Sequence, residues 1–149
     1  MSNFAFNEGL LLLANGDLDL DGIDLRVLLC KELNDVKANP DAVVLSDLSL
    51  DEYAGSGYVR VAVTGMTLAW NDAERRVELL ADNPVFPTLG PDVTPAVGAL
   101  YFLHLGADSL SKPLFWHDQG GWPKNGTGQD FTLVLSPAGI ATLRRGQIV

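Results

Sequence analysis

The spacing of apolar residues predicts β-strands along most of the chain. Residues 97–105 are almost continuously apolar, which is typical of a strand that is covered on both faces. Residues 114–117, 131–135 and 140–143 are shorter apolar runs bounded by turn residues, and we expect each of them to form a strand. Residues 23–29 alternate instead, so that four apolar side chains share one face: Ile23, Leu25, Val27 and Leu29.

A change of phase divides residues 58–70. The apolar residues occupy odd positions from 59 to 63 and even positions from 66 to 70. A strand that keeps both sets on one face must slip by one residue, so we predict a bulge or bend at Gly65. Asn71 and Asp72 favour turns, and residues 75–80 are therefore predicted to return as the partner strand of a hairpin.

Helical spacing is confined to the first residues of the chain. Residues 3–15 carry apolar side chains three or four positions apart, and Gly16 stands where a helix is expected to end. A second, single helical turn is predicted at residues 50–53, with Ser46 or Ser49 as its N-cap. Four prolines between positions 84 and 95 exclude a long helix from that stretch.

Together these elements predict a mainly β fold: an antiparallel β-sandwich or barrel of six to eight strands with one short N-terminal helix. A chain of 149 residues buries about two-thirds of its unfolded surface without metal or disulfide support. Neither a repeat nor a shift in composition marks a boundary, so residues 1–149 are expected to form a single β-rich domain. Apolar residues at 47% and charged residues at 19% exclude a disordered chain.

The chain is acidic, with a formal net charge of −9. Residues 1–52 hold 11 of the 19 acidic side chains but only 3 of the 10 basic ones, so one face or end should carry most of the negative potential. This region is either a solubilising surface or a docking edge for a basic partner. The charge argues against a nucleic acid as partner. No membrane partner is expected either, because the aliphatic run at residues 10–14 is too short to span a bilayer.

The string from Asp17 to Gly22 matches the opening of a calcium-binding loop. Asp17, Asp19 and Asp21 occupy its acidic positions, but the twelfth position is Leu28 where such a loop needs a bidentate glutamate. A turn whose carboxylates face water is therefore the preferred interpretation. We predict neither a metal site nor a cofactor for this chain.

Neither histidine is accompanied by the residues that nucleophilic catalysis requires. His104 and His117 lie in predicted strands, and the chain contains no Gly-x-Ser-x-Gly string. Cys30 ends a strand that is expected to be buried, so its thiol is interpreted as core filler. A single cysteine also excludes an internal disulfide and a multi-cysteine metal cluster. These residues predict structural roles and no enzymatic activity.

Two segments are long for simple connections. Residues 34–47 are polar and are expected to pack over one end of the sandwich. Residues 118–129 contain four glycines and Trp122. This tryptophan is either an exposed anchor for a partner or a side chain that folds back to cover an end of the sandwich, and the sequence leaves both alternatives open.

Three stretches resemble small virion proteins of tailed bacteriophages, which are often encoded beside the major capsid protein. The first is the N-terminal helix followed by an acidic turn and the strand at residues 23–29. The second is residues 50–60, and the third is residues 81–90 running into residues 97–102. The chain departs from the family within residues 114–128, where two tryptophans and a proline interrupt what is otherwise a simple hairpin.

The resemblance implies a non-enzymatic structural protein, most specifically a capsid decoration (cement) protein. Such a protein is synthesised in the host cytoplasm and located in the virion, on the outer capsid surface, where it bridges copies of the major capsid protein. It implies a homo-oligomer, and a trimer would match the threefold positions of a capsid. The candidate partner-binding residues are Phe4 and Phe6 in the N-terminal segment, Asp17, Asp19 and Asp21 in the acidic turn, and Trp122.

Two other functions stay open on the sequence. One is a phage neck, tail or fibre component that binds a connector or a host surface glycan, with the aromatic residues between 116 and 122 as a sugar platform. The other is a small-molecule-binding barrel or a hydrolase, which requires a deep pocket lined by titratable groups with perturbed pKa values.

Overall fold

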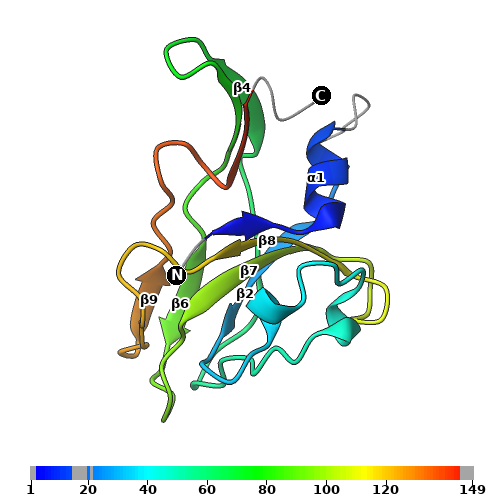
Figure 1. Ribbon diagram of the computed structural model, residues 1–149. Coiled ribbons are helices and arrows are strands. Elements are labelled where there is room, and N and C mark those ends of the chain that lie inside the picture. The colour runs from blue at the N-terminus through cyan, green and yellow to red at the C-terminus, as the bar shows by residue number, and fades with distance from the viewer. Residues whose placement is uncertain (1–2, 15–19, 21, 145–149) are drawn as a thin grey trace.

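The computed structural model describes residues 3–14, 20 and 22–144 (Figure 1). In this part of the chain ten strands form three antiparallel sheets, accompanied by one α-helix and two short 3-10 helices. Eight of the strands have four or more residues, and the other two have two residues each. The mainly β fold with one short helix near the N-terminus is therefore confirmed.

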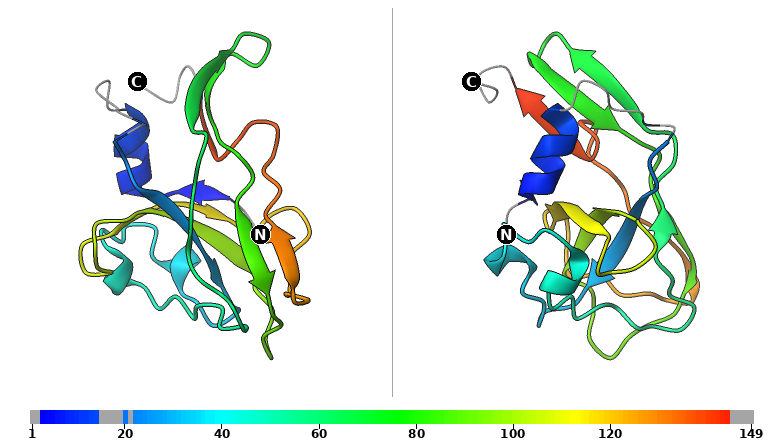
Figure 2. Two further views of the ribbon diagram at one scale, coloured as in Figure 1. Left: turned by 180° about the vertical axis from the view of Figure 1, so that it is seen from behind. Right: turned by 90° about the vertical axis from the view of Figure 1, so that its right-hand side faces the viewer.

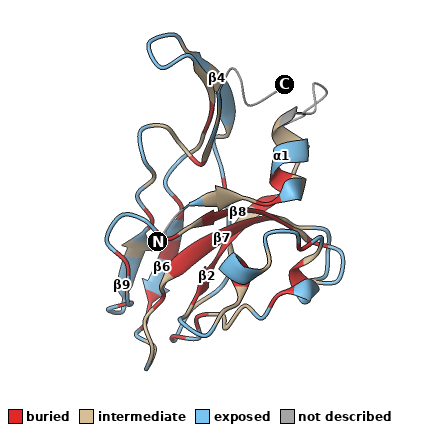
Figure 3. Ribbon diagram, in the orientation of Figure 1, coloured by how far each residue is buried: buried red, intermediate tan, exposed pale blue. Residues whose placement is uncertain are grey.

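The largest sheet has five strands in the order β1-β8-β7-β2-β3. These are β1 (Phe4–Ala5), β8 (Lys112–His117), β7 (Gly98–Leu103), β2 (Leu25–Cys30) and β3 (Val61–Ala62). The strands β2 and β7 pair over their whole length and are buried almost throughout (Figure 3). The continuous apolar character of β7 predicts this burial.

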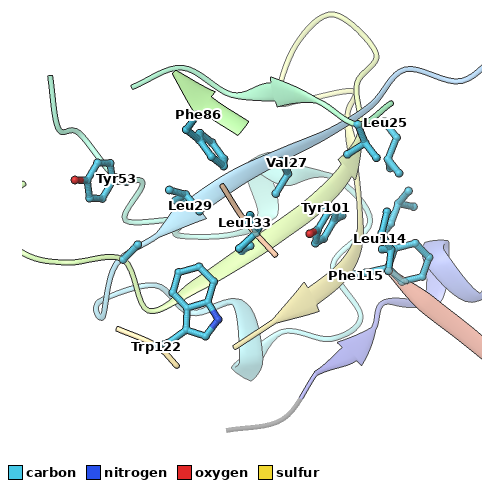
Figure 4. Close-up of a cluster of buried hydrophobic side chains, with 14 of the residues drawn as sticks. Leu25, Val27, Leu29, Tyr53, Phe86, Tyr101, Leu114, Phe115, Trp122 and Leu133 are labelled. Carbon is cyan, nitrogen blue, oxygen red and sulfur yellow. The ribbon is translucent and has the colours of Figure 1, made fainter. Parts of the chain in front are cut away.

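Both faces of the five-stranded sheet are covered. Leu25, Val27 and Leu29 point from β2 into the larger core, as their alternation predicts (Figure 4). Leu28 and Cys30 point to the opposite face, where they belong to a second core. The segment that includes the 3-10 helices Val36–Ala38 and Leu45–Asp47 covers this second core with three buried side chains: Val36, Ala42 and Leu45. This segment was expected over one end of the sandwich, but it packs against a face of the sheet.

The larger core is closed by the two smaller sheets. One pairs β6 (Val85–Leu89) with β9 (Gln129–Thr132) and contributes the buried side chain of Phe86. The other has the order β10-β5-β4 and contributes Leu79. Figure 2 shows from two sides how these sheets lie against the central strands.

The three-stranded sheet consists of β4 (Thr67–Asn71), β5 (Arg76–Leu80) and β10 (Ala141–Arg144). The chain reaches it from β3 through Gly65, whose φ of 66° is a left-handed conformation that suits glycine. The bend at Gly65 and the hairpin that follows are thus confirmed. The bend moves the chain from one sheet to another, and the hairpin projects away from the five-stranded sheet (Figures 1 and 2).

The N-terminal helix is shorter than its spacing predicts. Helix α1 spans Asn7–Ala14, whereas Phe4–Ala5 form the strand β1 and pair with Trp116 and Phe115. The open edge of β8 accepts these residues as a strand, and this pairing overrides the helical spacing of the first turn. The described chain contains no helix with the length and apolar character that crossing a membrane requires.

The helical turn predicted at residues 50–53 is wrong. Glu52 bridges Cys30 in an antiparallel manner, and the Tyr53 N–H donates to the Leu29 carbonyl oxygen at 2.9 Å. These residues extend the edge of β2, because the main chain there gains hydrogen-bond partners that a local turn does not offer. The 3-10 turn lies earlier, at Leu45–Asp47.

Candidate functional site

The β4–β5 hairpin carries an apolar face. Leu68 lies opposite Leu79, and Trp70 lies opposite Val77, so these four side chains share one side of the sheet. Strand β10 extends the same side with two more apolar residues, Ala141 and Leu143, which pair with Leu79 and Val77.

This apolar face is buried at its base and exposed towards its outer edge. Leu79 is 2% exposed and belongs to the larger core, which anchors the hairpin to the body of the protein. Leu68 is 42% exposed and Trp70 is 54% exposed. A large aromatic side chain with more than half of its surface in water gains free energy when a partner covers it.

The opposite face of the hairpin is polar and internally paired. Arg76 Nε donates to Glu78 Oε2 at 2.8 Å, and Asn71 Nδ2 approaches the same oxygen at 3.3 Å. At the turn, the Glu74 N–H donates to Asn71 Oδ1 at 3.1 Å, and Arg75 adopts a φ of 55°. These bonds hold the hairpin in shape, so the exposed apolar residues form a preorganised surface.

Sequence reasoning did not select Leu68 or Trp70 as contact residues. The signal was the same change of phase that predicted the bend at Gly65, because it places both residues on one face of a hairpin. What the spacing does not show is whether another element covers that face, which depends on tertiary packing.

The aromatic residues chosen in the N-terminal segment have different environments. Phe6 is 0% exposed and packs in the second core, so its assignment as a surface contact is wrong. Phe4 is half-buried, with its ring centroid 5.0 Å from that of Phe6. Pairing of Phe4 and Ala5 with β8 turns the next side chain, Phe6, into the protein.

Trp122 is not an exposed anchor. Its side chain is 9% exposed and belongs to the larger core, and Lys124 Nζ lies 5.4 Å from the centroid of its ring (Figure 4). The sequence left open whether Trp122 is an exposed anchor or folds back onto the domain. In the structure it folds back onto the domain.

The acidic turn lies outside the described residues. The predicted contacts Asp17, Asp19 and Asp21 all fall there, so their contribution to a site stays a prediction. Within the described ranges no group of three or more His, Cys, Asp or Glu side chains could hold a metal ion.

The titratable side chains singled out for catalysis make structural contacts. His117 Nε2 lies 2.7 Å from the carbonyl oxygen of Ile140, and burial lowers the pKa of this histidine. The main-chain N–H of His104 donates to the Asp24 carbonyl oxygen at 2.8 Å. Cys30 is 0% exposed, and burial raises the pKa of its thiol well above the ordinary value, which disfavours the reactive thiolate.

Comparisons of this chain with protein-family models, with curated proteins and with solved structures find no match. The features that bear on function are therefore those of the chain itself. They are the exposed apolar face of the hairpin and the excess of negative charge.

Proposed function

We propose that this chain is a structural protein of a tailed-phage virion that attaches to the outside of the head and bridges neighbouring capsid subunits. The observation that carries the proposal is the apolar face of the β4–β5 hairpin, on which Trp70 is 54% exposed. A projecting, rigid hairpin with an exposed aromatic residue has the properties of an interface anchor. Burial of Trp70 and Leu68 against the major capsid protein would supply the attachment.

The net charge of −9 favours the outer side of the shell. Packaged DNA is a dense polyanion, and an acidic domain on the inner wall would be repelled by it. The acidic residues of the first third of the chain then face solvent or a basic patch of the capsid, and the apolar hairpin supplies attraction that salt does not screen.

Attachment in many copies makes a modest single contact effective. A capsid presents the same surface repeatedly, so a subunit that touches two neighbours, or that associates with further copies of itself, gains from the high local concentration of sites. A homotrimer at threefold positions is the simplest arrangement that satisfies both conditions.

The alternative of a neck, tail or fibre protein was expected to use the aromatic residues between 116 and 122 as a sugar platform, and these residues do not support it. Trp116 is 1% exposed and Trp122 is 9% exposed, so neither presents an open ring face on which a sugar could stack.

Co-sedimentation with empty heads tests the proposal. The purified full-length chain is mixed with shells assembled from the major capsid protein of the same phage, and the bound amount is measured against concentration. The wild-type chain is expected to sediment with the shells. Replacement of Trp70 by serine is expected to weaken binding by about 10-fold or more, because an anchor residue of an interface typically contributes 2 kcal/mol or more.

A matched control separates binding through the hairpin from non-specific hydrophobic association with the shells. Leu33 is 79% exposed and lies outside the hairpin, so Leu33→Ser removes an exposed apolar side chain without touching the proposed contact. This variant is expected to bind as the wild-type chain does. Failure of the wild-type chain to sediment with the shells, or equal losses for Trp70→Ser and Leu33→Ser, would overturn the proposal.

A further inference from the structure

A second surface feature is a cleft of about 800 Å³ on the side of the larger core. The central sheet contributes Tyr101, Phe115 and His117 to its lining. Further lining residues come from β1, α1, β10 and the segment that precedes β10. The hairpin residues Leu68 and Trp70 do not line it, but Ala141, on the apolar side of the same sheet, does, so the cleft adjoins the proposed capsid contact without including its two exposed residues.

The charge of the cleft is opposite to that of the protein. The chain carries 19 acidic side chains, yet among the residues that the structure describes no aspartate or glutamate lines the cleft. The lining includes Lys124, together with uncharged polar side chains such as Asn3, Gln119 and Thr142. A cleft without carboxylates in an acidic protein favours a ligand that is itself anionic.

Lys124 is held in place by its surroundings. Its main-chain N–H and C=O exchange hydrogen bonds of 2.8 Å with Ala96, and its ammonium group lies 5.4 Å from the ring centroid of Trp122 and 6.0 Å from that of Phe131. Every ion pair found among the described residues involves a cation other than Lys124. Its charge is therefore available to a carboxylate that enters the cleft.

Two strands that border the cleft are the outermost strands of their sheets. Phe4 and Ala5 belong to β1, which ends the order of the five-stranded sheet, and Ala141 and Thr142 belong to β10, which ends the order of the three-stranded sheet. Each outermost strand has one edge where no described strand pairs with its main-chain N–H and C=O groups. Such an edge can accept a further strand from a partner.

We infer that this cleft binds an extended peptide segment of a partner protein, which adds as a strand beside β1 or β10 and places a carboxylate on Lys124. The apolar side chains of the walls, such as Leu10 and Leu13, would cover alternate side chains of the segment. An acidic glycan could also place a carboxylate on Lys124, but the aromatic residues that line the cleft do not suit a sugar. Tyr101, Phe115 and Trp122 are 0%, 1% and 9% exposed and present no ring face for a sugar.

Peptide selection on the intact chain tests the inference. A displayed library of random twelve-residue peptides is selected on the wild-type chain and counter-selected on Lys124→Glu, and the enriched peptides are synthesised. We expect peptides in which apolar residues alternate around an aspartate or glutamate. Titration calorimetry should give about 10-fold weaker binding to Lys124→Glu, and binding should return when the acidic residue of the peptide is replaced by lysine.

Three controls make the outcome decisive. Arg75→Glu makes the same charge change at an exposed position of the hairpin and should not affect peptide binding, and Lys124→Met removes the charge while keeping an unbranched side chain beside Trp122. Methylation of alternate main-chain nitrogens of the peptide should abolish binding, because a strand needs those N–H groups.

Three results would overturn the inference. They are a selection that enriches no peptide over the counter-selected variant, peptides that bind Lys124→Glu as well as the wild-type chain, and binding that survives main-chain methylation. An acidic oligosaccharide that binds in a Lys124-dependent manner where no peptide does would assign the cleft to glycans instead. The inference does not depend on the proposed function, since peptide binding is measured on the isolated chain and shell binding with Trp70→Ser.

Discussion

His117 and Ile140 are joined by a contact of 2.7 Å between the ring Nε2 and the main-chain carbonyl oxygen. The contact ties β8 in the central sheet to the residue that precedes β10 in the three-stranded sheet. His117 is half-buried, with its ring centroid 4.9 Å from that of Tyr101. Burial lowers its pKa, while the bond to Ile140 and the charge of Asp118 act in the opposite direction but do not cancel the effect of burial.

The first prediction is that the protein loses stability when the pH falls below about 6.5. The unfolded chain binds a proton at His117 near its ordinary pKa of 6.5, but the folded chain resists protonation until a lower pH. Stability from the neutral ring is therefore fully present above pH 6.5 and declines as the pH falls to the folded-state pKa. The free energy of unfolding in urea should decrease by up to about 1.4 kcal/mol per pH unit in this window.

A histidine variant separates the contribution of His117 to the pH dependence of stability from that of the carboxylates. His117→Gln keeps an amide donor for the Ile140 carbonyl oxygen and should remove this decrease between pH 7.5 and pH 5.5. An identical pH dependence in the wild-type chain and in His117→Gln would contradict the prediction.

The hairpin and its bend were predictable because their signals are local. The phase change at Gly65 and the turn residues Asn71 and Asp72 act over a few positions, and the structure has a bend and a turn at those places. Burial of both faces of β7 was likewise visible in the uninterrupted apolar character of residues 97–105, although Leu105, beyond the end of the strand, is 45% exposed. No local pattern predicts that Trp70 is exposed and Trp122 is buried. The burial of each tryptophan depends on which distant segments of the chain pack against it.

The cleft could not be predicted for the same reason. Its lining joins residues from position 3 to position 142, which come from β1, α1, β7, β8 and β10 and from the segments that flank them. The absence of carboxylates from that lining is a property of the folded surface, and the composition of the chain, with 19 acidic residues, points the other way. Phe6 is a second case in which the spacing of apolar residues did not predict burial. Its side chain is buried because Phe4 and Ala5, the two residues before it, pair with β8.

Removal of the hydroxyl group should affect the free energy of unfolding differently at two buried tyrosines. The Tyr53 hydroxyl lies 2.6 Å from the Gly90 carbonyl oxygen and accepts a hydrogen bond from the Gly126 N–H at 3.0 Å. Tyr53→Phe leaves these main-chain groups without that partner and should cost about 1–2 kcal/mol of unfolding free energy, measured by urea denaturation.

Tyr101→Phe is the matched control. The Tyr101 hydroxyl is buried without a hydrogen-bond partner among the described residues, so its removal should change the free energy of unfolding by less than about 0.5 kcal/mol or should stabilise the protein. Equal losses in the two variants would show that the hydroxyl of Tyr53 does not contribute through the bonds described above.

Arg60 should contribute more to stability than an arginine with an equally short but more exposed ion pair. Its guanidinium group binds both Glu52, at 2.9 Å, and Asp108, at 2.7 Å. The side chains of Arg60 and Glu52 are 23% and 26% exposed, so Arg60→Met leaves the Glu52 carboxylate partly desolvated without its partner and should cost about 2 kcal/mol, whereas Asp108 is 46% exposed and adds little. Arg26 and Asp24 form a pair of 2.9 Å with side chains 34% and 44% exposed, and Arg26→Met should cost less than about 1 kcal/mol in the same urea titrations. Equal costs would show that the network around Arg60 is fully solvated.

Tryptophan fluorescence should report directly on the proposed capsid contact. Of the three tryptophans in the chain, Trp70 is 54% exposed, whereas Trp116 and Trp122 are 1% and 9% exposed. Acrylamide should therefore quench one component of the emission efficiently, and Trp70→Phe should remove that component and leave a blue-shifted spectrum that resists quenching. Binding of the wild-type chain to capsid shells should protect the same component, because the shell covers Trp70. Quenching that is equally efficient in the free and the bound chain would place the contact on another face, and quenching that persists in Trp70→Phe would mean that a second tryptophan is open to solvent.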